Sequence, residues 1–338
     1  MGNHCDLHTH STYSDGTFSP AELIAEAAKI GLSAVALTDH NTVAGLPEFV
    51  AAARESSVEA IPGVEISTDY DGLELHLVGL YLPSEHWDLI ESKLDHFNRK
   101  KEESNRILIR NLCQAGYVLD YEKIRLSHPQ GTVNRAVIAA ALLEKGYVDS
   151  VNDAFQGLLS KTSGYYVPPE RLDVFDAIRF LRSVGAVPVL AHSFLNLKTE
   201  AQLRLFLQQA IPHGLAAMET MYSSYSPETT ALARQIAREF GLPESGGSDF
   251  HGRTKPHIQL GVGKGNLNIP SAFVEKLKNC ILAKTAHSGM IRNGQSHYHI
   301  SRHRPSAVRR RFQPVPAAEA GTRRLQRSAS APSAVPPV

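Results

Sequence analysis

A closely spaced pair of histidines lies near the start of the chain, where His8 and His10 flank Thr9 and Asp15 follows five residues later. Alternate side chains of a β-strand point to the same face, so the two imidazoles would converge at the end of such a strand. Asp15 could reach the same point from the following turn. Imidazole and carboxylate groups in this arrangement are ligands for divalent metal ions, although two histidines on a solvated strand would give the same local pattern. The segment therefore predicts a metal site where the fold begins.

Further residues of the same types recur at the ends of later apolar runs. Taken alone, His76 could be a buried histidine with an ordinary hydrogen bond. His192 is more informative because it ends the apolar run VPVLA, where an imidazole is expected only beside a pocket. Together, the strand-end residues predict a polynuclear metal centre. Its candidate ligands are His8, His10, Asp15, His40, Glu65, His76, His192, Asp249 and His251.

The elements that must position these residues follow an α/β rhythm. We expect strands at 6–9, 33–38, 60–67, 186–191, 215–220 and 244–248, and helices at 20–30, 47–55, 174–183, 200–209 and 228–240. A hairpin is expected around Asp71 and Gly72, between 64–68 and 73–82. Strands that alternate with helices indicate a parallel sheet or barrel, in which functional residues lie at the carboxyl ends of the strands.

Two segments depart from this rhythm. From about 84 to 172 the chain has helical patterns at 87–114 and 134–145, which predicts a helical subdomain inserted in a domain that spans 1–283. Residues 284–338 are rich in Arg, Pro, Ala and Ser and contain ten basic residues against one acid. A composition without a core-forming pattern predicts a disordered basic tail.

The composition restricts the class of protein. Outside the tail the chain has 25 basic and 33 acidic residues, a balance that suits metal binding better than a nucleic-acid groove. Cys5, Cys113 and Cys280 are isolated, so we expect no disulfide and a reduced, cytoplasmic setting. No signal segment or membrane span is expected from the apolar runs.

Six segments resemble the PHP (polymerase and histidinol phosphatase) family of metal-dependent phosphoesterases. They are DLHTHSTYSDGT, ALTDHNTVAG, IPGVEIS, LELHLVG, VLAHS and SGGSDFHG, and the resemblance covers most of residues 5–265. It is greatest to the type that acts on 3',5'-bisphosphonucleotides or degrades RNA in the 5'-3' direction. The resemblance implies an α/β fold, a distorted (β/α)7 barrel with a helical insertion, and three divalent metals at its carboxyl end.

The resemblance also implies a role for each ligand. The implied sets are His8, His10 and Asp249 for the first metal, Glu65, His76 and His192 for the second, and Asp15, His40 and His251 for the third. Glu65 would bridge the first two metals. We therefore expect two to three Mn, Fe or Zn ions, which would produce a bridging hydroxide nucleophile near neutral pH. Glu65, His192 and Arg135 are the residues expected to act in catalysis.

Other matching positions indicate where the substrate binds. Arg135 in TVNRAVIAAALLEKGYV matches a phosphate-binding arginine of the family, and a guanidinium group fits phosphate well. Many relatives have a histidine where this chain has Val137, a departure that bears on any general acid or second phosphate contact there. Lys161, Tyr165 and Tyr166 resemble the loop before the family's YVP motif and are expected to line the mouth of the site.

The favoured hypothesis is a metal phosphoesterase that acts on a small phosphorylated substrate. Its expected substrate is a nucleotide: a 3',5'-bisphosphonucleotide, a nucleoside monophosphate or the end of a short oligonucleotide. Alternatives are a histidinol-phosphate phosphatase and a non-catalytic sensor of metal or phosphate. The cluster at 309–311 offers a further alternative, a nucleic-acid arm, although a tail without such a contact is the simpler expectation.

Overall fold

A nearly closed barrel of β-strands forms the centre of the computed structural model, which describes residues 3–127 and 133–291, with side chains as far as residue 281. The sheet runs in the order β1 (Cys5–Thr9), β2 (Ala34–Leu37), β3 (Glu59–Tyr70), β4 (Leu73–Leu80), β6 (Val187–Leu190), β7 (Ala217–Tyr222) and β8 (Glu244–Gly247). The short β5 (Leu172–Asp173) pairs with β3 outside this path. Main-chain hydrogen bonds join the two ends of the sheet, from Asp249 to His8 and from His10 to Phe250, each 2.9 Å long. The predicted distorted barrel is confirmed.

One strand runs against the others and causes the distortion. β4 is antiparallel to both β3 and β6, whereas the remaining neighbours along the path are parallel. The predicted hairpin around Asp71 and Gly72 produces this reversal, and both residues have positive φ angles. Because β4 is reversed, its amino end lies at the edge of the sheet where the parallel strands end. His76, near the start of β4, can therefore join ligands that follow the other strands.

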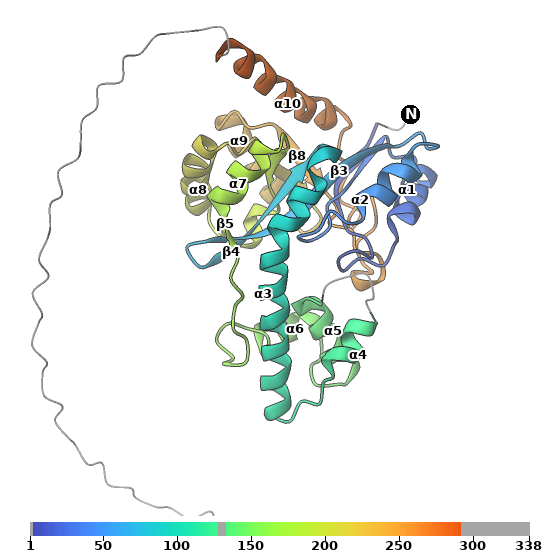
Figure 1. The fold of residues 1–338 in the computed structure, drawn as a ribbon, viewed down its shortest axis with the longest axis vertical. Coiled ribbons are helices and arrows are strands. Elements are labelled where there is room, and N and C mark those ends of the chain that lie inside the picture. The colour runs from blue at the N-terminus through green and yellow to red at the C-terminus, as the bar shows by residue number, and fades with distance from the viewer. Residues whose placement is uncertain (1–2, 128–132, 292–338) are drawn as a thin grey trace, which may run out of the picture. The chain divides into compact units, whose positions relative to one another are not determined.

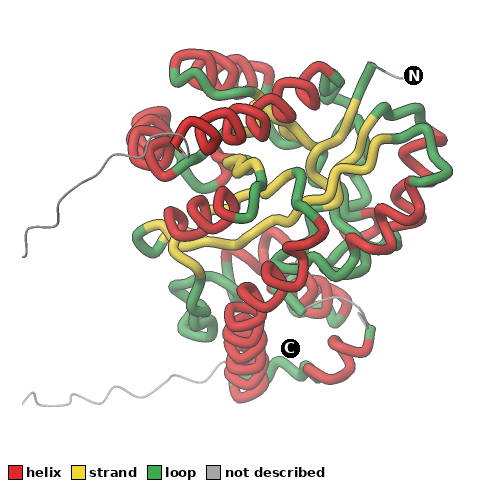
Figure 2. Tube along the Cα trace, turned by 45° about the horizontal axis from the view of Figure 1, so that its top comes forward, coloured by secondary structure: helices red, strands yellow, loops and turns green. Residues whose placement is uncertain are grey.

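Helices cover the outer face of the sheet, as the red and yellow tubes of Figure 2 show. They are α1 (Pro20–Lys29), α2 (Leu46–Ala53), α7 (Val174–Ser183), α8 (Glu200–His213) and α9 (Pro227–Glu239). The predicted start of α1 is confirmed: Ser19 and Glu22 form a reciprocal capping box, with Pro20 in the first turn. Within the described residues, no helix is both long and apolar enough to cross a membrane.

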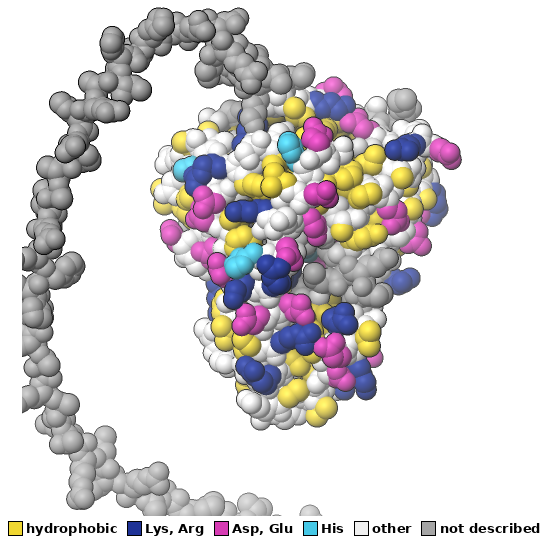
Figure 3. All heavy atoms as spheres, in the orientation of Figure 1, with side chains coloured by type: hydrophobic (Ala, Val, Ile, Leu, Met, Phe, Trp, Pro, Cys, Tyr) yellow, Lys and Arg dark blue, Asp and Glu magenta, His cyan; other side chains and the backbone are white. Residues whose placement is uncertain are grey.

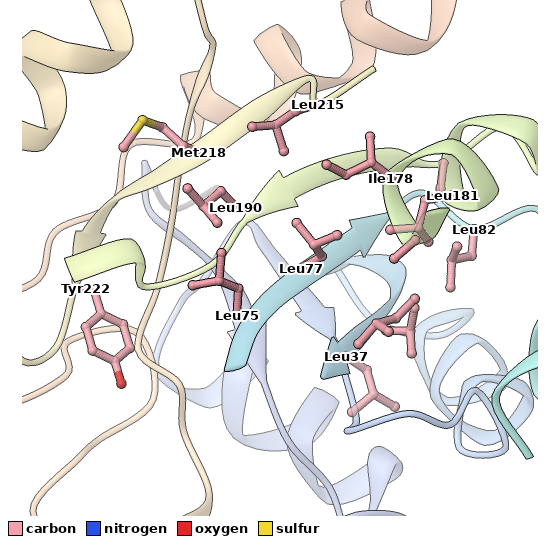
Figure 4. Packing of buried hydrophobic residues seen from close by; sticks show 14 of the residues in the cluster. Leu37, Leu75, Leu77, Leu82, Ile178, Leu181, Leu190, Leu215, Met218 and Tyr222 are labelled. Atoms are coloured by element: carbon pink, nitrogen blue, oxygen red, sulfur yellow. The ribbon is translucent and has the colours of Figure 1, made fainter. Parts of the chain in front are cut away.

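The main apolar core lies between the sheet and these helices. In Figure 4, Leu77 of β4 points toward Ile178 of α7, and Leu75 and Leu181 belong to the same buried cluster. Burial of each such leucine contributes roughly 1.5 to 3 kcal/mol. The alternate residues of β4, including Val78 and Leu80, belong to a second cluster on the inner face of the barrel. By the same alternation, His76 faces the inside of the barrel.

The predicted insertion forms a helical subdomain with a core of its own. It contains α3 (Trp87–Gln114), α4 (Tyr121–Leu126), α5 (Arg135–Glu144) and α6 (Val151–Gln156), and α3 extends away from the sheet (Figure 1). Its core includes Leu108, Leu112, Ile138 and Leu142. Basic and acidic side chains alternate over its surface (Figure 3), where Arg99 pairs with Asp95 and other pairs follow along α3.

The last described helix, α10 (Ala272–Ile291), packs Phe273, Val274 and Leu277 against the inner strand cluster. Three short 3₁₀ helices complete the described elements: η1 (Ser84–His86), η2 (Ser193–Leu195) and η3 (Gly252–Thr254). α10 continues to Ile291, beyond the boundary that we expected at residue 283. The rest of the predicted tail, including the cluster at 309–311, lies outside the described residues.

Candidate metal centre

The nine candidate ligands come together at the edge of the barrel where the parallel strands end. His8 and His10 are fully buried at the end of β1, and their ring centroids are 5.2 Å apart. Gly247 of β8 lies so close to β1 that a Cβ atom there would be 2.1 Å from that of His8. The close approach of the two strands therefore requires glycine at this position.

Backbone strain is concentrated at the same edge. Among the described non-glycine residues, His192 and Asp249 adopt positive φ angles of 25° and 57°, and Asn41 beside His40 has 53°. Each such conformation costs roughly 1 to 3 kcal/mol and persists where the surrounding structure requires it. The strain indicates that the fold directs the side chains of His192 and Asp249, and that of His40 next to Asn41, to the site.

The carboxylate of Glu65 lies between two groups of imidazoles. Its Oε1 is 2.8 Å from both His76 Nδ1 and His192 Nε2. Its Oε2 is 3.4 Å from both His8 Nε2 and His10 Nε2 and 2.9 Å from His40 Nδ1. Each oxygen thus faces a different set of nitrogen donors, which is the arrangement that a carboxylate bridging two cations requires.

The donor atoms form four overlapping groups, each compact enough to hold a metal ion. The groups are His8, His10 and Asp249; His8, Glu65 and His192; His40, Glu65 and His76; and His10, Asp15, His40 and His251. Every candidate ligand belongs to at least one group. The set implied for the first metal coincides with one of these groups. The set implied for the third metal lies within another, which also contains His10. The set implied for the second metal is divided between two groups that share Glu65.

Unsatisfied polar atoms show that this donor set fits metal ions. Six buried side-chain N or O atoms among the described residues lack a hydrogen-bond partner. Five of them belong to the centre: His8 Nε2, His10 Nε2, Asp15 Oδ1, His40 Nδ1 and Glu65 Oε2. A buried polar atom without a partner costs roughly 1 to 3 kcal/mol, and coordination of a cation would remove this cost. Mixed imidazole and carboxylate donors without thiolates suit Mn, Fe and Zn.

Outer contacts orient the ligands. Glu219 Oε1 lies 2.8 Å from His8 Nδ1, and Glu219 Oε2 accepts the main-chain N–H of His192 at 2.6 Å. Tyr222 and Lys255 both donate to Asp249 Oδ2, at 2.9 Å and 2.8 Å. These contacts leave His8 Nε2 and Asp249 Oδ1 directed at the centre. Such outer partners fix ligand geometry and affect metal affinity.

For Glu65 and His10 the electrostatics favour the protonation states that bind metal. Burial raises the pKa of the Glu65 carboxyl, but His40, His76, His8 and a hydrogen bond from His192 outweigh it and hold this pKa well below its usual range. Burial lowers the pKa of His10, and His251 and His40 lower it further. An ionised carboxylate and a neutral imidazole are the forms that act as ligands.

The predicted substrate residues lie in different surroundings. Arg135 begins α5, and its guanidinium lies 4.4 Å from the ring centroid of buried Tyr166. Lys161 is exposed and donates to the carbonyl of Gly72 at the β3–β4 turn, 2.6 Å away. Tyr165 packs against the insertion core. Val137 is buried in the same core.

Two residues beside Arg135 were missed by the sequence reasoning. Glu74 Oε2 accepts from Arg135 and Arg171 at 3.0 Å and 2.8 Å, and Glu74 Oε1 lies 3.5 Å from His76 Nε2. Glu74 and His76 share one face of β4, which was a usable signal. Arg171 is distant in sequence and gave none. The structure thus connects Arg135 to the ligand His76 through Glu74.

Comparison with known proteins gives a consistent set of relatives. Residues 6–162 match the model of the PHP domain. The chain is 33% identical over 247 residues to a 5'-3' exoribonuclease of Haemophilus influenzae. The matched region covers 73% of this chain and 89% of the relative. It is 28% identical over 248 residues to a 3',5'-nucleoside bisphosphate phosphatase of Chromobacterium violaceum, with coverage of 73% and 86%. A solved structure from Bifidobacterium adolescentis, assigned as a metal-dependent phosphoesterase, is 28% identical and gives a TM-score of 0.71 over 83% of this chain and 97% of that one.

Proposed function

Since the chain belongs to the PHP family of metal-dependent phosphoesterases, we propose that it hydrolyses a phosphoester of a nucleotide, either a free 3',5'-bisphosphonucleotide or the 5' end of an RNA chain. The relatives named for RNA and for bisphosphonucleotides support this substrate class. A nucleotide with phosphate groups on both its 3' and 5' oxygens is common to a bisphosphonucleotide and to an RNA whose first nucleotide is 5'-phosphorylated. The proposed setting is the cytoplasm, which suits the free thiols of Cys5, Cys113 and Cys280.

The position of Glu65 is the observation that carries the proposal. Its two oxygens face separate groups of imidazoles, and five buried donor atoms of the centre lack hydrogen bonds. These atoms lie within ion-pair distance of one another without forming hydrogen bonds, as expected of groups that face a shared cation. Their arrangement supports two or three divalent cations that share Glu65.

We assign the ligands in three sets on this basis. They are His8, His10 and Asp249 for the first cation, Glu65, His76 and His192 for the second, and Asp15, His40 and His251 for the third. Glu65 would bridge the first and second. When bound, such cations acidify water to give a nucleophile near neutral pH and neutralise charge on the phosphate.

The protein's own side chains supply binding and orientation. Arg135 lies at the start of α5, where its planar group of donors suits a phosphate oxygen, and Tyr166 restricts its motion. Glu219, Tyr222 and Lys255 keep the ligands His8 and Asp249 in place. Orientation of this kind accelerates a reaction by holding the substrate and the nucleophile in reactive geometry.

A substrate panel tests the function. Metal-loaded wild-type protein is assayed with adenosine 3',5'-bisphosphate, adenosine 3'- and 5'-monophosphate, a 5'-phosphorylated RNA oligonucleotide, histidinol phosphate and a sugar phosphate. We expect the nucleotides to lead, and Arg135→Ala to lower kcat/KM on adenosine 3',5'-bisphosphate by roughly thirtyfold or more with unchanged metal content. A preference for histidinol phosphate of about tenfold or more would reject the nucleotide substrate. No turnover by fully metallated protein would favour the sensor.

A further inference from the structure

Two arginines of the insertion share one carboxylate oxygen beside the metal centre. Arg135 Nη2 and Arg171 Nη2 lie 3.0 Å and 2.8 Å from Glu74 Oε2. Arg135 belongs to α5, Arg171 precedes β5, and Glu74 belongs to β4, so three separate elements meet at this atom. A single oxygen cannot engage either guanidinium through two parallel hydrogen bonds, which is the geometry that arginine favours with anions.

Tyr166 holds the two guanidinium groups in position. The guanidinium of Arg135 lies over the Tyr166 ring, 4.4 Å from its centroid. The Tyr166 hydroxyl accepts a hydrogen bond from Arg171 Nη2 at 3.2 Å. Tyr166 is only 5% exposed, and the side chain of Arg171 only 7%. A buried aromatic support reduces the entropy that the arginines would lose on binding an anion.

The cluster has an excess of positive charge. Two guanidinium groups share the single carboxylate of Glu74, and Lys101 of α3 adds an electrostatic interaction with all three residues. The nearby Asp15, which also interacts with Lys101, is already directed at His251 in the metal centre. An excess of cations in a partly buried place favours a multiply charged anion.

The cluster is separated from the metal centre by one imidazole ring. Glu74 Oε1 lies 3.5 Å from His76 Nε2, and the other nitrogen of that ring lies 2.8 Å from Glu65 Oε1. An anion on the arginines would therefore lie beside a phosphate held at the metal centre. The side chains of Glu74 and Arg135 are 23% and 24% exposed, so the cluster is open to a ligand from outside.

We propose that Arg135 and Arg171 form the binding site for a second phosphate of the substrate, and that this phosphate replaces the carboxylate of Glu74. The inference rests on the function proposed above and assigns its specificity to the arginine pair. A phosphate dianion offers three terminal oxygens and two charges where Glu74 offers one shared oxygen, so both guanidinium groups gain hydrogen bonds in the exchange. The partly exposed carboxylate of Glu74 can then turn to solvent.

The kinetic test compares substrates that differ by one phosphate. We expect Arg171→Met to raise KM for adenosine 3',5'-bisphosphate by roughly thirtyfold and to change kcat/KM for the two adenosine monophosphates by less than about threefold. Arg171→Lys, which keeps the charge without the planar group, should give an intermediate KM. Equal losses on all three substrates would show a merely structural role for Arg171 and overturn the proposal.

A binding test separates this inference from the proposed function. Calorimetry on the metal-loaded full chain uses the bisphosphonate analogue of adenosine 3',5'-bisphosphate, in which methylene groups replace the ester oxygens and prevent hydrolysis. We expect Arg171→Met to weaken binding by roughly thirtyfold. Arg204→Met, which removes two surface ion pairs of an arginine on α8, should leave binding unchanged. An affinity that survives Arg171→Met rejects the second phosphate site. Arginine-dependent binding by a protein that hydrolyses nothing on the panel rejects the proposed function and keeps the site.

The Glu74→Gln variant tests whether the carboxylate is displaced. A neutral amide competes less with phosphate for the arginines, so we expect the bisphosphonate to bind several-fold more tightly, with little change for a monophosphonate analogue. Weaker binding of both analogues would show that Glu74 is needed to form the site and would overturn its displacement.

Discussion

The side-chain amide of Asn134 donates a hydrogen bond to Asp15 Oδ2 over 2.6 Å, and its carbonyl oxygen accepts the main-chain N–H of Val137 at the start of α5. One residue therefore joins a proposed metal ligand to the helix that begins with Arg135. The other oxygen of Asp15 lies 3.1 Å from His251 Nε2, within the metal centre. The insertion is thus anchored to the barrel at the site itself, which places the proposed substrate-binding residue Arg135 beside the candidate metal ligands.

Asn134→Asp tests this link without removing the helix cap. Aspartate caps a helix as well as asparagine does, so helix content should be unchanged, but a second carboxylate would face Asp15. We expect metal affinity to fall roughly tenfold or more, measured by Mn titration, with a matching loss in kcat/KM. Asp120→Asn, which exchanges the cap of α4, should leave both quantities unchanged. Wild-type metal affinity in Asn134→Asp would contradict the link.

Glu65→Gln tests the proposed bridge between the first two metal ions. The amide keeps the shape of the side chain but removes the negative charge that both groups of imidazoles and cations require. We expect the metal content, measured by elemental analysis, to fall by about one ion per chain and the hydrolysis rate to fall roughly a hundredfold or more. Leu190→Ile, a volume-conserving change in the core, should alter neither. Full occupancy and full activity in Glu65→Gln would reject the ligand assignment.

The sequence predicted those parts of the site that repeat a local pattern. The ligands follow apolar runs, and the reversal of β4 was visible in Asp71-Gly72 between two strand-like segments. Contacts between distant segments had no such signal. Arg171 reaches Glu74, and Asn134 reaches Asp15, only because the insertion folds back onto the barrel. Glu219 lay within a predicted strand, yet its role depends on the position of His8 across the barrel.

His76 should make metal binding depend on pH. In the metal-free chain burial lowers the pKa of His76, but Glu65 and Glu74 outweigh it and raise this pKa from 6.5 to about 9. The charged ring stabilises the metal-free fold fully below pH 6.5, and this contribution is lost as the pH rises through about 9. Because only the neutral ring binds metal, the apparent metal affinity should increase between these two values.

Calorimetry in buffers of different ionisation enthalpy checks this coupling. Near neutral pH, Mn binding to wild-type protein should release about one proton more than binding to His76→Gln. An apparent affinity that stays constant from pH 6.5 to 9 would show that His76 is already neutral in the metal-free chain.

Removal of residues 292–338 tests whether the folded domain ends with α10. The removed segment contains nine arginines and one acid, and it lacks the periodic apolar residues that α10 packs against the barrel, such as Phe273 and Leu277. We therefore expect the Tm, the metal content and kcat/KM on adenosine 3',5'-bisphosphate to stay within experimental error of the full chain. A clearly lower Tm would show that this segment packs on the domain.

Affinity of the shortened chain for single-stranded RNA, measured at several salt concentrations, should also equal that of the full chain. A loss of RNA affinity that is largest at low salt, with normal phosphatase activity, would identify the segment as a nucleic-acid arm, because phosphate contacts by arginine weaken as salt increases.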